Sequence, residues 1–176
     1  MKQQKISIIL LIFIGVLAGL STGLTLGQDE DPEYVGTREC RSCHRSYAND
    51  QEETLHFRTL IEVAEAEDDN VILANFDSGE DVRTTPFEDE TRPFTADDVF
   101  FTLGVGRHYQ AYVTEVEDGV YRVLPAQWSV AEEAWVPMPL ADDWADPAYD
   151  FNSQCASCHT TNFNTEKLEW DETGVQ

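Results

Sequence analysis

Two five-residue stretches decide how this sequence is interpreted: Cys40-Arg41-Ser42-Cys43-His44 and Cys155-Ala156-Ser157-Cys158-His159. Both have the form C-x-x-C-H, the attachment signature of c-type haem, and together they contain all 4 Cys of the chain. Two thiols on one turn of chain can each form a thioether to one porphyrin, and the adjacent His then ligates the iron. We therefore expect two covalently bound haem c groups. The predicted site residues are the thioether cysteines Cys40, Cys43, Cys155 and Cys158 and the proximal iron ligands His44 and His159.

Two other interpretations of the four cysteines are weaker. A structural zinc site is mainly an intracellular device and gives no reason for a His after each pair. Two disulfides within the C-x-x-C pairs would close very small loops, and such bonds are more often redox-active than structural. A thioredoxin-like site would also need a βαβ context, which the sequence does not indicate. Haem attachment is favoured over both.

The two remaining histidines, His56 and His108, are candidate distal ligands to the haem irons. A second His at the sixth position gives low-spin electron-transfer haem, whereas an open position can bind a small molecule. His56 lies in residues 46–66, whose apolar spacing predicts a helix, and His108 opens an alternating segment. The simpler interpretation is a solvated helix residue and a strand-end residue. Met138 is a weaker axial candidate, for which a packing role is favoured.

The N-terminus has the layout of a secretory signal. Lys2 and Lys5 precede an apolar run over residues 6–26, with no charged residue until Asp29. Because the run is long enough to span a bilayer, an uncleaved anchor is the alternative. Either way, we expect the rest of the chain to be exported. The predicted organisation is a signal peptide or anchor over 1–27, an acidic linker over 28–37 and a cytochrome domain over 38–176.

The chain is strongly acidic, with 34 Asp and Glu, 11 Lys and Arg, and a net charge of −23. Without residues 1–27, the 34 acidic residues face 9 basic ones, a net charge of −25. Such a surface excludes binding to a nucleic-acid backbone, and it leaves the N-terminal anchor as the only expected membrane contact. It fits a saline milieu or a basic electron-transfer partner.

The rest of the pattern predicts an α+β fold, with haem-bearing short helices around a small antiparallel sheet or hairpin and a core organised by haem. Glu117-Asp118-Gly119 between two alternating runs is a strong hairpin signal, and Pro125 places the second arm at an edge or bulge. The expected elements are a helix over 46–66, strands over 71–74 and 99–103, hairpin arms over 109–116 and 120–130, a strand over 135–138 and a short helix over 152–159.

Beyond the two motifs, three blocks of sequence are specific in combination. They are Tyr34-Val35-Gly36 with Leu55-His56-Phe57, residues 102–128 around Asp118-Gly119, and residues 150–162 around the second motif. With these blocks the chain resembles the multihaem c-type cytochromes related to the tetrahaem electron carrier of nitrifying bacteria. The resemblance implies that His56 is an axial ligand. Family members continue past a segment like residues 170–175 into a third C-x-x-C-H, so we expect a fragment of a longer cytochrome that lacks later haem motifs.

These features together predict an exported di- or multihaem c-type cytochrome that carries electrons, with a redox partner protein or a further haem domain as its partner. One alternative is a fragment of a multihaem oxidoreductase that acts on a nitrogen or sulfur oxyanion at a five-coordinate haem. Another is a subunit of an extracellular cytochrome filament. The electron carrier is favoured over the enzyme, and the available histidines discriminate between them: if His56 and His108 each ligate an iron, no open site remains.

Overall fold

The computed structural model describes residues 34–66 and 70–173. The chain divides into two units, Met1–Glu33 and Tyr34–Gln176, of which only the second is described. The expected signal or anchor over 1–27 therefore lies outside the described residues, as does most of the acidic linker over 28–37. Within 34–66 and 70–173, no helix is long and apolar enough to cross a membrane.

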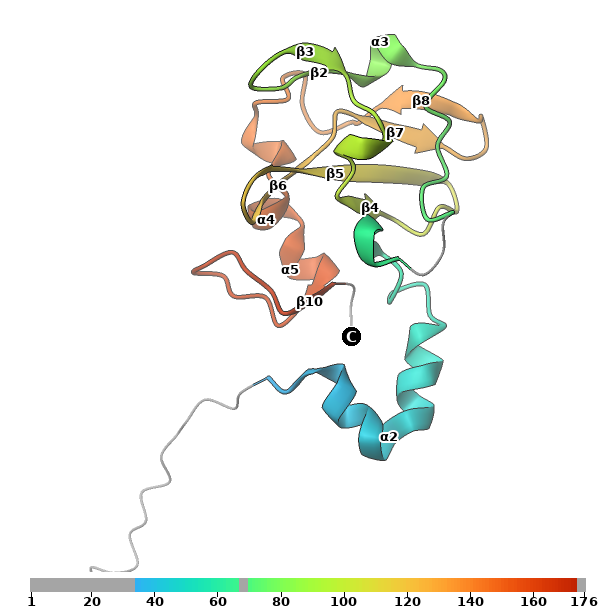
Figure 1. Ribbon diagram of the computed structural model, residues 1–176, viewed down its shortest axis with the longest axis vertical. Coiled ribbons are helices and arrows are strands. Elements are labelled where there is room, and N and C mark those ends of the chain that lie inside the picture. Colours follow the sequence, from blue (N-terminus) through green and yellow to red (C-terminus); the bar gives the residue numbers. More distant parts are fainter. Residues whose placement is uncertain (1–33, 67–69, 174–176) are drawn as a thin grey trace, which may run out of the picture. The chain divides into compact units, whose positions relative to one another are not determined.

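A six-stranded antiparallel sheet forms the centre of the described unit (Figure 1). Its strands are β1 (Leu60–Glu62), β4 (Phe101–Leu103), β5 (Tyr109–Glu117), β6 (Val120–Val123), β7 (Ala126–Ser129) and β8 (Ala134–Pro137). The order is β1-β4-β5-β7-β8, and β6 also pairs with β5. The sheet and the flanking helices confirm the predicted α+β class.

Strand β5 is the longest strand and organises the sheet. Val113 to Glu117 pair with β6 and the first two residues pair with β7, while β4 lies along the other edge. The predicted hairpin is confirmed, with Gly119 at φ 71°, a left-handed conformation that the tight turn requires. The expected second arm over 120–130 is split at Pro125, because proline has no N–H to donate to a ladder.

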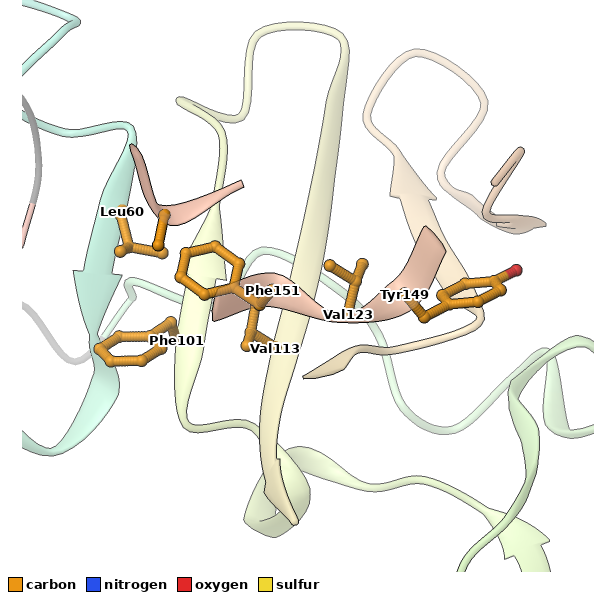
Figure 2. Packing of buried hydrophobic residues seen from close by; sticks show 7 residues of the cluster. Leu60, Phe101, Val113, Val123, Tyr149 and Phe151 are labelled. Atoms are coloured by element: carbon orange, nitrogen blue, oxygen red, sulfur yellow. The ribbon is translucent and has the colours of Figure 1, made fainter. Parts of the chain in front are cut away.

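Both faces of the sheet are covered by buried side chains. Successive β5 residues point to opposite faces, so Val113 belongs to one hydrophobic cluster and Tyr112 to another. The first cluster, shown in Figure 2, consists of Leu60, Phe101, Val113, Val123, Tyr149, Phe151 and Ala156. The second consists of Phe94, Val99, Tyr112, Leu124, Ala126, Trp128 and Trp135. Each large side chain buried there contributes about 1.5–3 kcal/mol through the hydrophobic effect.

The predicted helix over 46–66 is wrong in its bounds. Helix α2 spans Gly36–Glu52 and therefore begins before the first C-x-x-C-H motif. Turns follow, then β1 and a short 3-10 helix, η1 (Val63–Glu65). Leu60 and Ile61 match the apolar spacing of a helix, but pairing of β1 with β4 places them in the sheet.

The predicted strand over 71–74 is not formed, although the segment is held against the sheet. The Leu73 N–H donates to Gln110 Oε1 at 2.9 Å, and Gln110 Nε2 donates to the Val71 carbonyl at 2.9 Å. The Tyr112 hydroxyl also donates to Gln110 Oε1, at 2.8 Å. A buried side-chain amide thus satisfies the backbone groups that a neighbouring strand would otherwise bond.

The acid-rich stretch between residues 77 and 98 contains structure that the sequence did not predict. It forms α3 (Glu80–Arg83), the strand pair β2 (Thr84–Pro86) and β3 (Thr91–Pro93), and the 3-10 helix η2 (Ala96–Asp98). Arg83 is buried and donates to the carbonyls of Phe76, Ser78 and Phe94. The guanidinium also lies 5.3 Å from the Phe76 ring centroid. A buried cation satisfied in this way fixes the loop to the second cluster.

The predicted strand over 135–138 and short helix over 152–159 are confirmed, the first as β8. After the 3-10 helix η3 (Pro147–Tyr149), the helical segment comprises α4 (Phe151–Gln154) and α5 (Ala156–His159), with an irregular residue, Cys155, between them. Two short strands, β9 (Thr160–Thr161) and β10 (Glu172–Thr173), pair after it. The second motif is therefore enclosed by regular structure.

Candidate haem-attachment sites

The second motif lies on one turn of helix at the α4–α5 junction. The N–H groups of Cys158 and His159 both donate to the Cys155 carbonyl, at 3.1 and 3.2 Å. Residues three apart on a helical turn lie on the same face, so this turn directs both thiols to one side. Cys158 is exposed and Cys155 half-buried. The geometry fits attachment of both thiols to one planar macrocycle.

The His159 side chain fits the role of proximal iron ligand. It is half-buried, and within the described residues its Nδ1 atom is buried without a hydrogen-bond partner. Burial lowers the pKa of the imidazole below its usual value, which favours the neutral form. A metal-ligating His must be neutral, so the surroundings of His159 favour the state that can bind iron.

The surroundings of Cys155 differ from those of a redox-active thiol. Burial, followed by the nearby Asp150 and Cys158, raises the pKa of the Cys155 thiol. A redox-active C-x-x-C pair needs a lowered thiol pKa, so the second motif differs from such a site. All four cysteines are free thiols. Among the described residues, no three of His, Cys, Asp and Glu gather as ligands around one point, the arrangement that a structural zinc would need.

The first motif lies on an exposed and bent helix. Helix α2 consists of two helical pieces that meet at His44, where φ is −116° and ψ is 38°. Cys40, Cys43 and His44 are all exposed. Arg41, inside the motif, bridges the bend through a two-pronged ion pair with Glu52, at 2.5 and 2.7 Å. The bend is thus held by Arg41, which occupies one of the two x positions of the C-x-x-C-H motif.

Both motifs have a serine before the second cysteine, and the two serines make similar contacts. Ser42 Oγ lies 3.7 Å from Cys43 Sγ, and Ser157 Oγ lies 3.9 Å from Cys158 Sγ. Ser42 also donates to the Glu39 carbonyl at 2.8 Å. The repeated contact indicates that the second cysteine has a similar local environment in both motifs.

The two candidate distal ligands lie in different parts of the fold, and both are exposed. His56 is in the turns between α2 and β1, where its carbonyl accepts a bond from the Thr59 hydroxyl at 2.9 Å. His108 directly precedes β5, where its carbonyl accepts the Val130 N–H at 2.9 Å. The expected helix around His56 is absent, whereas the strand-end position of His108 is observed. Their role at iron stays a prediction.

A cavity of about 1170 Å³ lies beside α2 and the segment near residue 170, and among the described residues no Cys or His of either motif lines it. Arg41 of the first motif lines it, and so does Asp171, whose N–H donates to the carbonyl of Thr161, two residues after His159. Its apolar walls include Leu55, Phe57, Leu60, Ile61, Leu73 and Trp170. Ligand pockets for large cofactors are concave and mostly apolar, with volumes of roughly 300–1000 Å³. The lining mixes these apolar side chains with the charged side chains of Arg41, Glu52, Arg58, Glu62, Glu65 and Asp171, so the cavity does not have the mostly apolar walls of such a pocket.

Met138 does not belong to this cavity. It packs against the first hydrophobic cluster and lines a separate hollow of about 670 Å³ together with Tyr149. The Tyr149 hydroxyl donates to the Met138 carbonyl at 3.2 Å. The packing role that the sequence favoured for Met138 is confirmed.

Comparison with known proteins gives matches only among solved structures: no family model and no curated protein matches the chain. The chain is similar to the outer cell wall cytochrome OcwA, with a TM-score of 0.58 and 21% identity over 82% of this chain and 30% of that one. An undecahaem cytochrome from the S-layer of Carboxydothermus ferrireducens gives a TM-score of 0.47 and 18% identity, over 81% of this chain and 19% of that one.

The chain therefore spans less than a third of the length of either structure that it matches. At 21% identity, the likeness to OcwA shows a shared fold. The resemblance to the tetrahaem cytochromes of nitrifying bacteria stays a prediction. The described unit has one C-x-x-C-H motif before its sheet and one after it, and its fold is similar to that of a part of OcwA.

Proposed function

We propose that the chain is an exported c-type cytochrome segment that carries electrons through two covalently bound haem c groups. The observation that carries this proposal is the second motif, where Cys155, Cys158 and a half-buried His159, whose pKa is lowered by burial, share one helical turn. The fold shared with a cell wall cytochrome supports it. Each haem c, when bound, supplies an iron that takes up and releases one electron.

The residues of the chain hold the group and set its environment. Cys40 and Cys43 would hold one haem, and Cys155 and Cys158 the other. His44 and His159 would be the proximal ligands, and His56 and His108 the distal ones. Burial of each haem and the hydrogen bonds around it would set its potential.

The proposed cellular location and partner follow from the N-terminal residues and from the net charge. Residues 1–27 would direct export or anchor the protein, 28–37 would act as an acidic linker, and 38–176 would form the cytochrome domain. The partner would be a redox protein or a further haem domain, in the manner of the multihaem carriers that the sequence resembles. A net charge of −23 supports a cationic partner and opposes nucleic-acid binding.

Maturation with covalent haem tests the proposal. The full chain is expressed with a c-haem maturation system, and intact mass and optical spectra are recorded. Two added haems and sharp low-spin reduced bands are expected, and the paired changes Cys40→Ala with Cys43→Ala or Cys155→Ala with Cys158→Ala should each remove one haem. No covalent mass increase would overturn the proposal. A high-spin ferric band that shifts with nitrite or hydroxylamine would instead favour the oxyanion-reducing enzyme.

The two distal candidates are tested by His56→Ala and His108→Ala in the matured protein. If each ligates an iron, each change converts one haem to a high-spin form. A matched control is Thr165→Ala, an exposed polar residue in a surface turn. A low-spin spectrum that persists in a histidine variant removes that histidine from the ligand set.

A further inference from the structure

The first x position of the C-x-x-C-H motif is held differently in the two motifs. In the second motif it is Ala156, which is 0% exposed and belongs to the first hydrophobic cluster. In the first motif it is Arg41, on a helix that buries only Ala48 among its described residues. Core packing therefore does not fix the first motif as it fixes the second. The contacts of Arg41 decide how the first motif is held.

The Arg41 guanidinium reaches across the bend at His44 to the second helical piece of α2. Its Nη1 and Nη2 atoms donate to the two carboxylate oxygens of Glu52, at 2.5 and 2.7 Å, and Nη2 also donates to Asn49 Oδ1 at 2.8 Å. Arg41 and Glu52 are 11 positions apart, and in a straight helix such residues lie about 16 Å apart along the axis, too far for a direct ion pair. The contact thus forms only because the helix bends at His44.

The second helical piece also brings an aromatic ring against His44. The ring centroids of His44 and Tyr47 lie 6.3 Å apart, with an angle of 58° between the ring planes. This separation is within the range in which aromatic rings attract each other. Both side chains are exposed, so burial does not fix the imidazole. Its direction depends on where the second piece places Tyr47.

We infer that Arg41 is a positioning residue for His44: by clamping the two helical pieces it holds Tyr47 against the imidazole and fixes the direction of that ring toward the iron. The assignment rests on the proposed function, in which His44 is the proximal ligand of the first haem. Groups around a ligating His set its ring orientation and so tune the metal. A two-pronged contact suits this role, because it fixes the relative direction of the two groups that it joins.

The test uses the full chain with both haems attached, in the variants Arg41→Gln, Glu52→Ala and the exchange of Arg41→Glu with Glu52→Arg. Loss of Arg41 and loss of Glu52 change the local charge in opposite directions. An effect common to both variants therefore reports the bend and not the charge. Arg45→Gln is the matched control, because Arg45 follows His44 directly, is exposed and has no ion pair within the described residues.

The readout is the electron paramagnetic resonance spectrum of the ferric protein, because the shape of haem signals depends on the orientation of the axial imidazole rings. The signal of the first haem is the one that is absent when Cys40→Ala and Cys43→Ala are combined. The signal of the second haem is the internal reference. Intact mass and melting temperature are recorded for every variant.

Arg41→Gln and Glu52→Ala should each broaden the signal of the first haem roughly twofold, because the His44 ring then takes a range of orientations. The signal of the second haem should not change, Arg45→Gln should leave both signals unchanged, and the exchange should restore the original width. Four results would overturn the assignment: no broadening in Arg41→Gln, broadening in only one of the two single variants, equal broadening in Arg45→Gln, or no recovery in the exchange.

The same measurements separate this inference from the proposed function. If intact mass shows no attached haem in the unaltered chain, the proposed function fails and the inference fails with it. If two haems are attached but the Arg41 and Glu52 variants behave as the control, only the positioning role of Arg41 fails. Because α2 is largely exposed, these variants should fold, and an unchanged melting temperature verifies this.

Discussion

The first motif lies on α2, where Ala48 is the one buried residue, whereas the second lies in a segment whose neighbours Tyr149, Phe151, Ala156 and Thr160 are all buried. Both motifs have the same C-x-x-C-H pattern and the same serine next to the second cysteine. The two motifs differ in the contacts that hold them in place. The first is held by one ion pair across a bend, and the second is part of a hydrophobic core.

The comparison shows that the motif encodes the attachment chemistry but not the rigidity of the site. Asn152 illustrates the difference: its Oδ1 accepts the Tyr121 N–H at 2.8 Å, and its Nδ2 donates to the carbonyls of Gly119 and Leu168 at 2.9 and 3.1 Å. One buried amide thus ties the second motif to the hairpin and to the segment that follows it. In the proposed cytochrome, a fixed site would change little when the iron changes its charge, which would favour rapid electron transfer.

The largest expected effect is the loss of the core contact at the second motif. Phe151 is 0% exposed in the first cluster, so Phe151→Ala should lower the free energy of unfolding by about 3–5 kcal/mol. Denaturant unfolding of the matured protein measures this. The matched change at the first motif is Tyr47→Ala, at a side chain that is 74% exposed, and it should cost less than about 0.5 kcal/mol. Similar costs for both would show that the motifs are equally supported.

The second largest expected effect is the loss of the side-chain hydrogen bonds of Asn152. Asn152→Ala leaves the N–H of Tyr121 and the carbonyls of Gly119 and Leu168 without this partner. Because these partner groups are only partly buried, the loss of these bonds should lower the unfolding free energy by about 1–2 kcal/mol in the same assay. In α2 the exposed Asn49 accepts one bond from Arg41, and Asn49→Ala should cost less than about 1 kcal/mol. An unchanged free energy of unfolding in Asn152→Ala would mean that these hydrogen bonds do not stabilise the second motif.

Thiol reactivity distinguishes the motifs in chain made without haem maturation. Cys155 is half-buried and burial raises its pKa, so alkylation near neutral pH should be several-fold slower there than at the exposed Cys40 and Cys43. Because only the thiolate reacts, the rate at Cys155 should keep rising as the pH is increased toward its raised pKa. Time-resolved mass spectrometry of labelled peptides gives the four rates. Equal rates at all pH values would show that the second motif is not held without haem.

The features that the sequence predicted are those that depend on adjacent residues. The attachment signature, the Asp118-Gly119 turn and the helical turn of the second motif are all local patterns, and the structure contains each turn where it was expected. The break at Pro125 was also predictable, because it follows from the missing N–H of one residue. Local chemistry of this kind needs no knowledge of the remaining chain.

The features that the sequence did not predict depend on distant partners. Leu60 and Ile61 fit a helical pattern, and only their pairing with Leu103 and Thr102 makes them a strand. Gln110 is a polar residue in a strand, and nothing near it in sequence shows that it holds residues 71–73. The cavity likewise joins α2 to a segment near residue 170. Non-local pairing, rather than propensity, decides these regions.

The smallest expected effect is at the bend of α2. Arg41→Gln removes the ion pair with Glu52 but leaves the helix largely exposed, so stability should change by less than about 1 kcal/mol. Amide hydrogen exchange should nevertheless become faster between His44 and Glu52, because the two helical pieces lose the contact that fixes their angle. Arg45→Gln is the matched control, an exposed arginine of the same helix without an ion pair in the described residues. Faster exchange in the control as well would show that helix propensity, and not the ion pair, maintains the bend, and the difference between the two motifs would then rest on core packing alone.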